Sequence, residues 1–291
     1  MAQPLLKLAK TNGTTLGYAE WNPDLKGQAP SLLLTHATGF HGRVWDSLIA
    51  RLPRMHVISV DLRGHGRSET SVIESWQQVT DDVSGLIDVL ALPAWIGVGH
   101  SMGGHVLLRS TAMKRGTARK LILIDPMIAS PGRYADASSW FPSDEMHPAA
   151  RRKRTFSSVD EMIDRFRNRE PYRSFDADVM RDYCVHGLAP RHDGADGLEL
   201  ACAPETEASV YMTSHQSGGI MDLLSRAELP VLVVRAPILE QRSFKSSPTW
   251  PGLAGALPQG RDLFLPDYSH FVPFEAPALI AATIEAECAQ S

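Results

Sequence analysis

The chain has 291 residues, enough to bury a large core as one domain or as one domain with an inserted module. Its 29 Lys and Arg against 33 Asp and Glu give a net charge of −4, which offers no electrostatic basis for binding nucleic acid or an anionic membrane. The three cysteines lack metal-type spacing, no apolar stretch approaches the length of a membrane span, and the first residues lack a leader pattern. We therefore expect a cytoplasmic protein with reduced thiols.

The first half of the chain alternates strands with helices. Residues 7–21 alternate apolar and polar side chains around Asn12-Gly13, which predicts a hairpin. Apolar runs predict buried strands at residues 31–35, 56–61, 94–98 and 121–124. Helical spacing predicts helices at residues 44–52 and 75–90. This alternation predicts an α/β fold with a mostly parallel sheet and helices on both faces.

The pattern changes after Pro126. Residues 128–225 are polar and helical in pattern, with interspersed aromatics and no convincing buried strand. A block of this size, inserted late into a parallel sheet, predicts a helical cap over the active site, because structureless loops of that length are uncommon. The core would then comprise residues 1–127 and 226–291. The β/α alternation resumes at residues 230–234, 263–265 and 276–287.

A Gly-x-Ser-x-Gly motif at residues 99–103 is the most informative feature of the chain. It lies between an apolar strand and a helical segment, where the turn is so tight that its flanking positions require glycine. Such a turn, called a nucleophile elbow, lifts the hydroxyl of Ser101 above the edge of the sheet, which predicts that Ser101 is a nucleophile. The helical segment after it is called the elbow helix.

A serine hydroxyl needs a base to remove its proton. His270 follows the last predicted strand, so it emerges at the carboxyl edge of the sheet, where active sites of such sheets collect. The order of serine early and histidine near the end of the chain also favours His270 as the base.

Two carboxylates are candidates for the acid that orients the histidine. Asp125 ends the strand that follows the elbow helix, where a buried carboxylate needs a partner such as His270. Asp125 also precedes Pro126, and Asp-Pro commonly starts a turn. Glu240 follows the strand near residues 231–234, a stretch without an Asp. We favour Asp125 and keep Glu240 as the alternative.

Acyl transfer also requires donors for a developing oxyanion. The backbone N–H of Met102, at the start of the elbow helix, would supply one. Thr38, in the loop at residues 36–40, is the first candidate for the second, with Ala37 next. Aromatic and methionine side chains would line an apolar pocket above Ser101, and the predicted substrate contacts are Phe40, Met127, Trp140 and Phe271.

Four motifs together resemble the α/β-hydrolase superfamily, and more narrowly its small, cap-bearing bacterial serine hydrolases. They are His-Ala-Thr-Gly at residues 36–39, Asp-Leu-Arg-Gly-His-Gly-Arg-Ser at 61–68, Gly-His-Ser-Met-Gly-Gly at 99–104 and Ser-His-Phe-Val-Pro at 269–273. The resemblance covers the predicted core and implies a Ser–His–acid triad, an acyl-enzyme at Ser101 and a water activated by His270. Most such enzymes carry the acid in a Gly-x-x-Asp context near residue 240, from which this chain departs. Some use the position of Asp125.

The expected activity is hydrolysis of a hydrophobic carboxylic ester or lactone. Three alternatives on the same fold are hydrolysis of a carbon–carbon bond in a ring-fission product, cofactor-free dioxygenation, and a non-catalytic receptor. The first of them predicts a cap arginine at the pocket. Serine at the elbow disfavours epoxide hydrolases and haloalkane dehalogenases, which use Asp there. The sequence shows neither a metal-ligand cluster nor a nucleotide-type phosphate loop, so we expect no cofactor and no metal. The expected partner is a small-molecule substrate, and the expected state is a monomer or homodimer.

Overall fold

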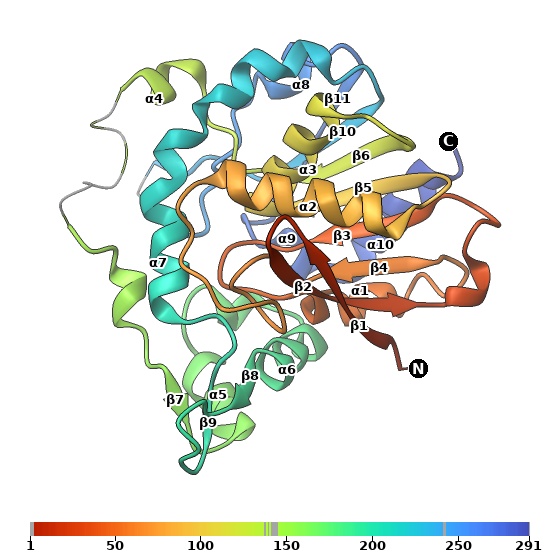
Figure 1. The fold of residues 1–291 in the computed structure, drawn as a ribbon. Coiled ribbons are helices and arrows are strands. Elements are labelled where there is room, and N and C mark those ends of the chain that lie inside the picture. The colour runs from red at the N-terminus through yellow and green to blue at the C-terminus, as the bar shows by residue number, and fades with distance from the viewer. Residues whose placement is uncertain (1–2, 137, 139, 141–144, 241–242, 291) are drawn as a thin grey trace.

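The computed structural model describes residues 3–136, 138, 140, 145–240 and 243–290. The strands of its large sheet are β1 (Leu5–Thr11), β2 (Thr14–Trp21), β3 (Ser31–Thr35), β4 (Val57–Val60), β5 (Trp95–His100), β6 (Ala118–Ile124), β10 (Val231–Arg235) and β11 (Gly260–Phe264). They lie side by side in the order β1-β2-β4-β3-β5-β6-β10-β11 (Figure 1).

The sheet is antiparallel only at one edge. β1 pairs with β2 through the predicted hairpin, whose turn residues Asn12 and Gly13 have φ values of 43° and 74°. Positive φ at both turn positions suits the right-handed twist of a hairpin. β2 also pairs antiparallel with β4, and the remaining neighbours pair in parallel. The mostly parallel α/β sheet predicted from the sequence is therefore confirmed.

Alternate side chains of each central strand enter opposite cores. Leu33 of β3 packs into a cluster with α2 (Trp76–Leu90), α3 (Met102–Met113) and α8 (Leu253–Ala256). Its neighbours Leu32 and Leu34 pack on the other face, with α1 (Asp46–Ile49), α9 (Val272–Glu275) and α10 (Pro277–Cys288). All three leucines are fully buried, and each such side chain contributes about 2 kcal/mol of burial free energy. This double coverage explains why the strands read as continuous apolar runs.

Residues 128–225, here called the cap region, contain short strands as well as helices. The helices are α4 (Pro131–Ala135), α5 (Val159–Phe166), α6 (Ala177–His186) and α7 (Pro204–Thr213), with 3-10 turns η4 (Pro148–Arg151), η5 (Tyr172–Ser174) and η6 (Ser214–Arg226). β7 (Thr155–Phe156), β9 (Leu198–Leu200) and β8 (Leu188–Pro190) form a small antiparallel sheet, so the expectation of a purely helical block was wrong. These strands have two or three residues each, too few for a hydrophobic period to indicate them.

The small sheet, α5 and α6 lie together beside the large sheet, at the lower left of Figure 1. Ser158 and Asp176 begin α5 and α6 by accepting hydrogen bonds from backbone N–H groups of the first turn. Farther along the chain, Ile220 and Leu224 of η6 pack in the same cluster as α2 and α3. The bounds of the cap and its role as a lid stay predictions. Among the described residues, no helix has the length and apolarity needed to cross a membrane.

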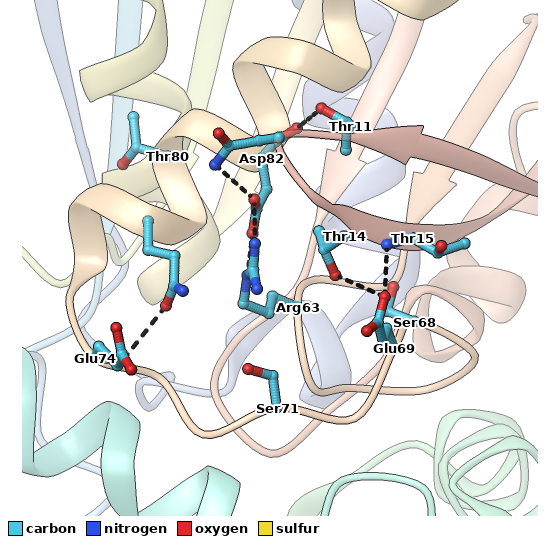
Figure 2. Close-up of polar contacts among 12 residues, drawn as sticks. Thr11, Thr14, Thr15, Arg63, Ser68, Glu69, Ser71, Glu74, Thr80 and Asp82 are labelled. Atoms are coloured by element: carbon cyan, nitrogen blue, oxygen red, sulfur yellow. Dashed lines mark hydrogen bonds and ion pairs between the residues drawn. The ribbon is translucent and has the colours of Figure 1, made fainter.

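The turn after β4 is fixed by polar contacts to the hairpin and to α2 (Figure 2). Arg63 donates two hydrogen bonds, of 2.6 and 2.7 Å, to the buried carboxylate of Asp82 on α2. Glu69 accepts from the backbone N–H of Thr15 at 3.1 Å. A surface hollow of about 480 Å³ lies at this hairpin, lined by residues 10–15 and Glu69 and by none of the predicted catalytic residues. These contacts fix the turn that carries His65.

Candidate active site

Ser101 stands at a sharp turn between β5 and α3. Its backbone angles, φ 54° and ψ −117°, are unusual for a residue with a side chain. The flanking glycines make the turn possible, because a Cβ at Gly99 would lie 2.6 Å from Cα of Gly104, and one at Gly103 would lie 2.5 Å from the carbonyl oxygen of Thr35. Backbone strain of this kind concentrates at functional sites when the surrounding structure enforces it.

Ser101, His270 and Asp125 form a continuous hydrogen-bonded chain. The hydroxyl of Ser101 lies 3.1 Å from Nε2 of His270, and Nδ1 of His270 lies 2.6 Å from Oδ2 of Asp125. Ser101 is 8% exposed and Asp125 is fully buried, so the three hydrogen-bonded residues lead from a carboxylate shielded from water to a slightly exposed hydroxyl. This order of groups can remove a proton from a serine hydroxyl and stabilise the imidazolium that results.

Both oxygens of the buried Asp125 carboxylate have hydrogen-bond partners. Asp125 directly follows β6 and has a positive φ of 42°. Its Oδ1 accepts from the backbone N–H of Ala236 at 3.1 Å and from the hydroxyl of Ser247 at 2.6 Å, which leaves Oδ2 for His270. Glu240, the alternative acid, is exposed. Sequence reasoning did not identify Ser247, and no motif marks it.

The backbone of His270 is held on both sides. Nε2–H of His100, the residue before Ser101, donates to the carbonyl oxygen of His270 at 2.8 Å. Complete burial, with His270 nearby, lowers the pKa of His100 well below its ordinary value, so His100 is a neutral donor. The N–H of His270 donates to the carbonyl oxygen of Lys245 at 3.0 Å. The predicted base is therefore positioned by the residue next to the predicted nucleophile.

The loop at residues 36–40 lies against the start of α3. The hydroxyl of Thr38 contacts Sδ of Met102 at 3.8 Å. Within the part of the chain that the structure describes, the backbone N–H groups of Thr38 and Met102 donate to no protein acceptor. Both are thus available to an oxyanion, and their role as the oxyanion hole stays a prediction.

Two buried histidines hold this loop against the turn after β4. Nδ1–H of His65 donates to the carbonyl oxygen of Arg63 at 2.8 Å, so its Nε2 can accept from the N–H of Gly39, at 3.1 Å. His36 makes the reciprocal link: its Nδ1–H donates to the carbonyl oxygen of Ala37 at 2.8 Å, so its Nε2 can accept from the N–H of Leu62, at 2.9 Å. Burial lowers the pKa of His65 to about 4, which keeps it in the neutral form that can accept.

The four predicted substrate contacts differ in position. Phe40 and Phe271 belong to one aromatic cluster, with ring centroids 6.1 Å apart, and Phe271 also lies 5.1 Å from the ring of His270. Met127 is half-buried, and its N–H donates to the carbonyl oxygen of Ser101 at 3.0 Å. Trp140 stacks on Tyr134 at 5.3 Å. The first three lie beside the site through these contacts, whereas for Trp140 the described contacts are within its own segment, and its substrate role stays a prediction.

One cluster in the described residues has side chains of metal-ligand type. Single ligand atoms of Asp46, Asp182 and His186 all lie within 4.8 Å of one another. Arg43, however, already pairs with Asp46, donating from Nε at 2.7 Å. A fixed guanidinium at one ligand disfavours a divalent cation by charge repulsion, and we assign no metal to this cluster.

Known proteins resemble this chain in fold or in sequence. E-2-(acetamidomethylene)succinate hydrolase superimposes with a TM-score of 0.73 and 22% sequence identity, over 97% of this chain and 98% of that one. The AB hydrolase superfamily protein YisY of Bacillus subtilis is 27% identical over 231 residues, which are 76% of this chain and 77% of YisY. Lipase LipV of Mycobacterium tuberculosis is 33% identical over 104 residues, which are 35% of this chain and only 40% of LipV.

The sequence profile of the alpha/beta hydrolase family matches residues 32–283. The match begins in β3 and ends within α10, so it spans the elbow, the cap region and the segment that carries His270. The strand order, the elbow and this match agree with the resemblance noted in the sequence. The chain belongs to the alpha/beta hydrolase family.

Proposed function

We propose that this protein is a serine hydrolase that cleaves a hydrophobic carboxylic ester or lactone. The observation that carries the proposal is the hydrogen-bonded chain from Ser101 through His270 to Asp125. The similarity to a lipase over 104 residues supports the same reaction class.

In the proposed reaction, the hydroxyl of Ser101 attacks the acyl carbon while Nε2 of His270 takes its proton. The N–H groups of Met102 and Thr38 stabilise the negative charge on the carbonyl oxygen. His270 then gives the proton to the leaving group, and an acyl-enzyme forms on Ser101. A water activated by His270 releases the acid, while Asp125 keeps the proton of the neutral imidazole on Nδ1.

The apolar character of the substrate is inferred from the aromatic rings beside the base. The ring centroid of Phe40 lies 6.1 Å from those of Phe175 and Phe271, and 5.0 Å from that of Tyr183. Phe175 and Tyr183 come from the cap region, so residues 128–225 would close over the bound acyl group as a lid. Burial of such rings against an apolar substrate provides binding energy without requiring a specific polar partner.

Carbon–carbon bond hydrolysis is the second candidate, and Arg152, whose partner Glu207 packs against the loop at Gly39, does not favour it. That reaction predicts a guanidinium free to bind a dienoate carboxylate. Arg152 is instead paired with Glu207 and donates to the hydroxyl of Tyr183 at 2.9 Å. Its charge is already balanced, which is why we favour an ester or lactone.

The test is the rate of hydrolysis of p-nitrophenyl esters from acetate to octanoate. We expect turnover by the parent protein and a loss of at least about 10³-fold in Ser101→Ala, because a triad member contributes several orders of magnitude. Ser225→Ala, at an exposed serine of η6, is the control and should match the parent. An unchanged rate in Ser101→Ala would refute the nucleophile. No turnover of any ester would favour carbon–carbon hydrolysis, oxygenation or a binding role, which oxygen uptake and ligand binding would separate.

A further inference from the structure

A buried ion pair of the cap region touches the loop at residues 36–40, here called the oxyanion loop because Thr38 is predicted to bind the oxyanion. Arg152, directly after η4, pairs with Glu207 on α7. The carboxylate of Glu207 is packed against Gly39, since a Cβ at Gly39 would lie 2.9 Å from Cδ and 3.0 Å from Oε1 of Glu207. Glu207 is 7% exposed, so water screens its charge little.

The same guanidinium contacts Tyr183, which packs against the end of the loop. Nη2 of Arg152 donates to the hydroxyl of Tyr183 at 2.9 Å, and that ring lies 5.0 Å from the ring of Phe40. Tyr183 also accepts, through its carbonyl oxygen, a hydrogen bond of 3.1 Å from His41. Residues 39–41 are thus bounded by cap-region groups on one side and by His65 on the other.

A buried carboxylate at this place creates an electrostatic problem for the proposed chemistry. The N–H of Thr38 is expected to stabilise an oxyanion one residue away from the point where Glu207 touches the loop. An uncompensated negative charge there would repel the developing negative charge of the transition state, strongly because the surroundings are dry. The positive charge of Arg152 removes this repulsion.

We infer that Arg152 is a positioning and charge-compensating residue for the oxyanion loop, acting through Glu207 and Tyr183. This inference rests on the proposed function, because it assigns the pair a part in stabilising an oxyanion. It also implies that the cap region must be docked for the loop to be competent, since both partners of the pair come from that region. Neither Arg152 nor Glu207 needs to touch the substrate.

The discriminating experiment is a charge-rescue series assayed on p-nitrophenyl butyrate at pH 8. In Arg152→Met the buried carboxylate of Glu207 loses its partner, and we expect kcat to fall by about 10- to 100-fold with KM changed less than about three-fold. In the double variant Arg152→Met/Glu207→Gln no charge remains, so kcat should recover to within about three-fold of Glu207→Gln alone. An ion pair that only stabilises the fold would lower the free energy of unfolding in Arg152→Met, and the double variant would restore it, but kcat of the folded single variant would be unchanged.

A neighbouring ion pair supplies the matched control. Arg154 and Glu205 come from the same two segments and also pair, but their side chains are 39% and 54% exposed. Arg154→Met should leave kcat unchanged, because surface pairs contribute little. If Arg152→Met does not fold, Arg152→Gln, which can still donate to the tyrosine without carrying charge, replaces it with the same expectation.

Hydrogen exchange of the loop provides a readout that does not depend on turnover. Peptides covering residues 36–41 should exchange faster in Arg152→Met than in the parent, and near the parental rate in the double variant and in Arg154→Met. Unchanged exchange in Arg152→Met, or a kcat of the double variant that stays as low as that of Arg152→Met, would overturn the inference. A parent protein without esterase activity would instead refute the proposed function, and the exchange data would still decide whether the pair positions the loop.

Discussion

Replacing Asp125 by Asn should leave the geometry of the site intact and reverse the hydrogen bond to His270. Oδ1 of Asp125 accepts from the N–H of Ala236 and from the hydroxyl of Ser247, so the oxygen of an Asn amide would remain at that position. The amide NH₂ would then face Nδ1 of His270, at the present distance of 2.6 Å. His270 would have to accept there and carry its proton on Nε2, the atom that should take the proton of Ser101.

The opposite amide orientation would restore the useful tautomer, but it would set NH₂ against the N–H of Ala236. Loss of that buried hydrogen bond and repulsion between two donors make this orientation rare. The wrong tautomer in a serine triad lowers kcat by about 10⁴-fold, equivalent to about 5.4 kcal/mol of activation free energy.

Steady-state hydrolysis of p-nitrophenyl esters measures this loss, with circular dichroism to verify that Asp125→Asn is folded. Glu240→Gln is the matched control, because Glu240 is exposed, and it should retain the parental rate. A large loss in Glu240→Gln together with an active Asp125→Asn would refute the assignment of the acid.

Three further substitutions test other parts of the structure. Ser247→Ala removes one donor from the carboxylate of Asp125 and should lower kcat by about ten-fold, or about 1.4 kcal/mol, in the same assay; an unchanged kcat would show that Ser247 is dispensable. Gly103→Ala would place its Cβ 2.5 Å from the carbonyl oxygen of Thr35, so we expect a loss of about 3 kcal/mol or more in the free energy of unfolding by urea, and wild-type stability would contradict the close approach. Burial, together with the charge of a neighbouring carboxylate, raises the pKa of Asp182 to about 7, so the folded state holds a proton there that the unfolded state releases. Stability from this group is fully present below about pH 4, near the pKa of an unfolded Asp, and is lost progressively as the pH rises to about 7. Asp182→Asn should therefore gain about 2 kcal/mol relative to the parent between pH 5 and pH 8 in urea unfolding, and a constant difference would refute the shift.

The predicted nucleophile and base could be located from the sequence because each depends on local chemistry. The turn at Ser101 needs glycine at Gly99 and Gly103 for reasons of space, and the structure has those close approaches. The acid could not be decided in this way. Asp125 and Glu240 each follow a strand, and only the fold brings Asp125 to His270, which lies 145 residues farther along the chain.

Two further features could not be predicted from the sequence pattern, namely the start of β11 and the ion pair of Arg152 with Glu207. β11 runs over Gly260–Phe264, earlier than the apolar run at 263–265, because it is an edge strand whose residues are half-buried or exposed. Hydrophobic pattern therefore does not mark its start. The pair of Arg152 and Glu207 joins residues 55 positions apart, and in the sequence the arginine is part of an ordinary basic run. Polar contacts between distant segments leave no periodic signal.

The proposal that Ser101 is the nucleophile of a hydrolase is tested most directly by trapping it. The protein would be treated with a fluorophosphonate and digested, and the modified residue identified by mass spectrometry, in the parent and in Ser101→Ala. We expect one adduct, on the peptide that contains Ser101, with loss of ester hydrolysis in proportion to labelling and no adduct in the variant. An unlabelled Ser101 in a protein that hydrolyses esters, or undiminished hydrolysis by Ser101→Ala, would contradict the assignment.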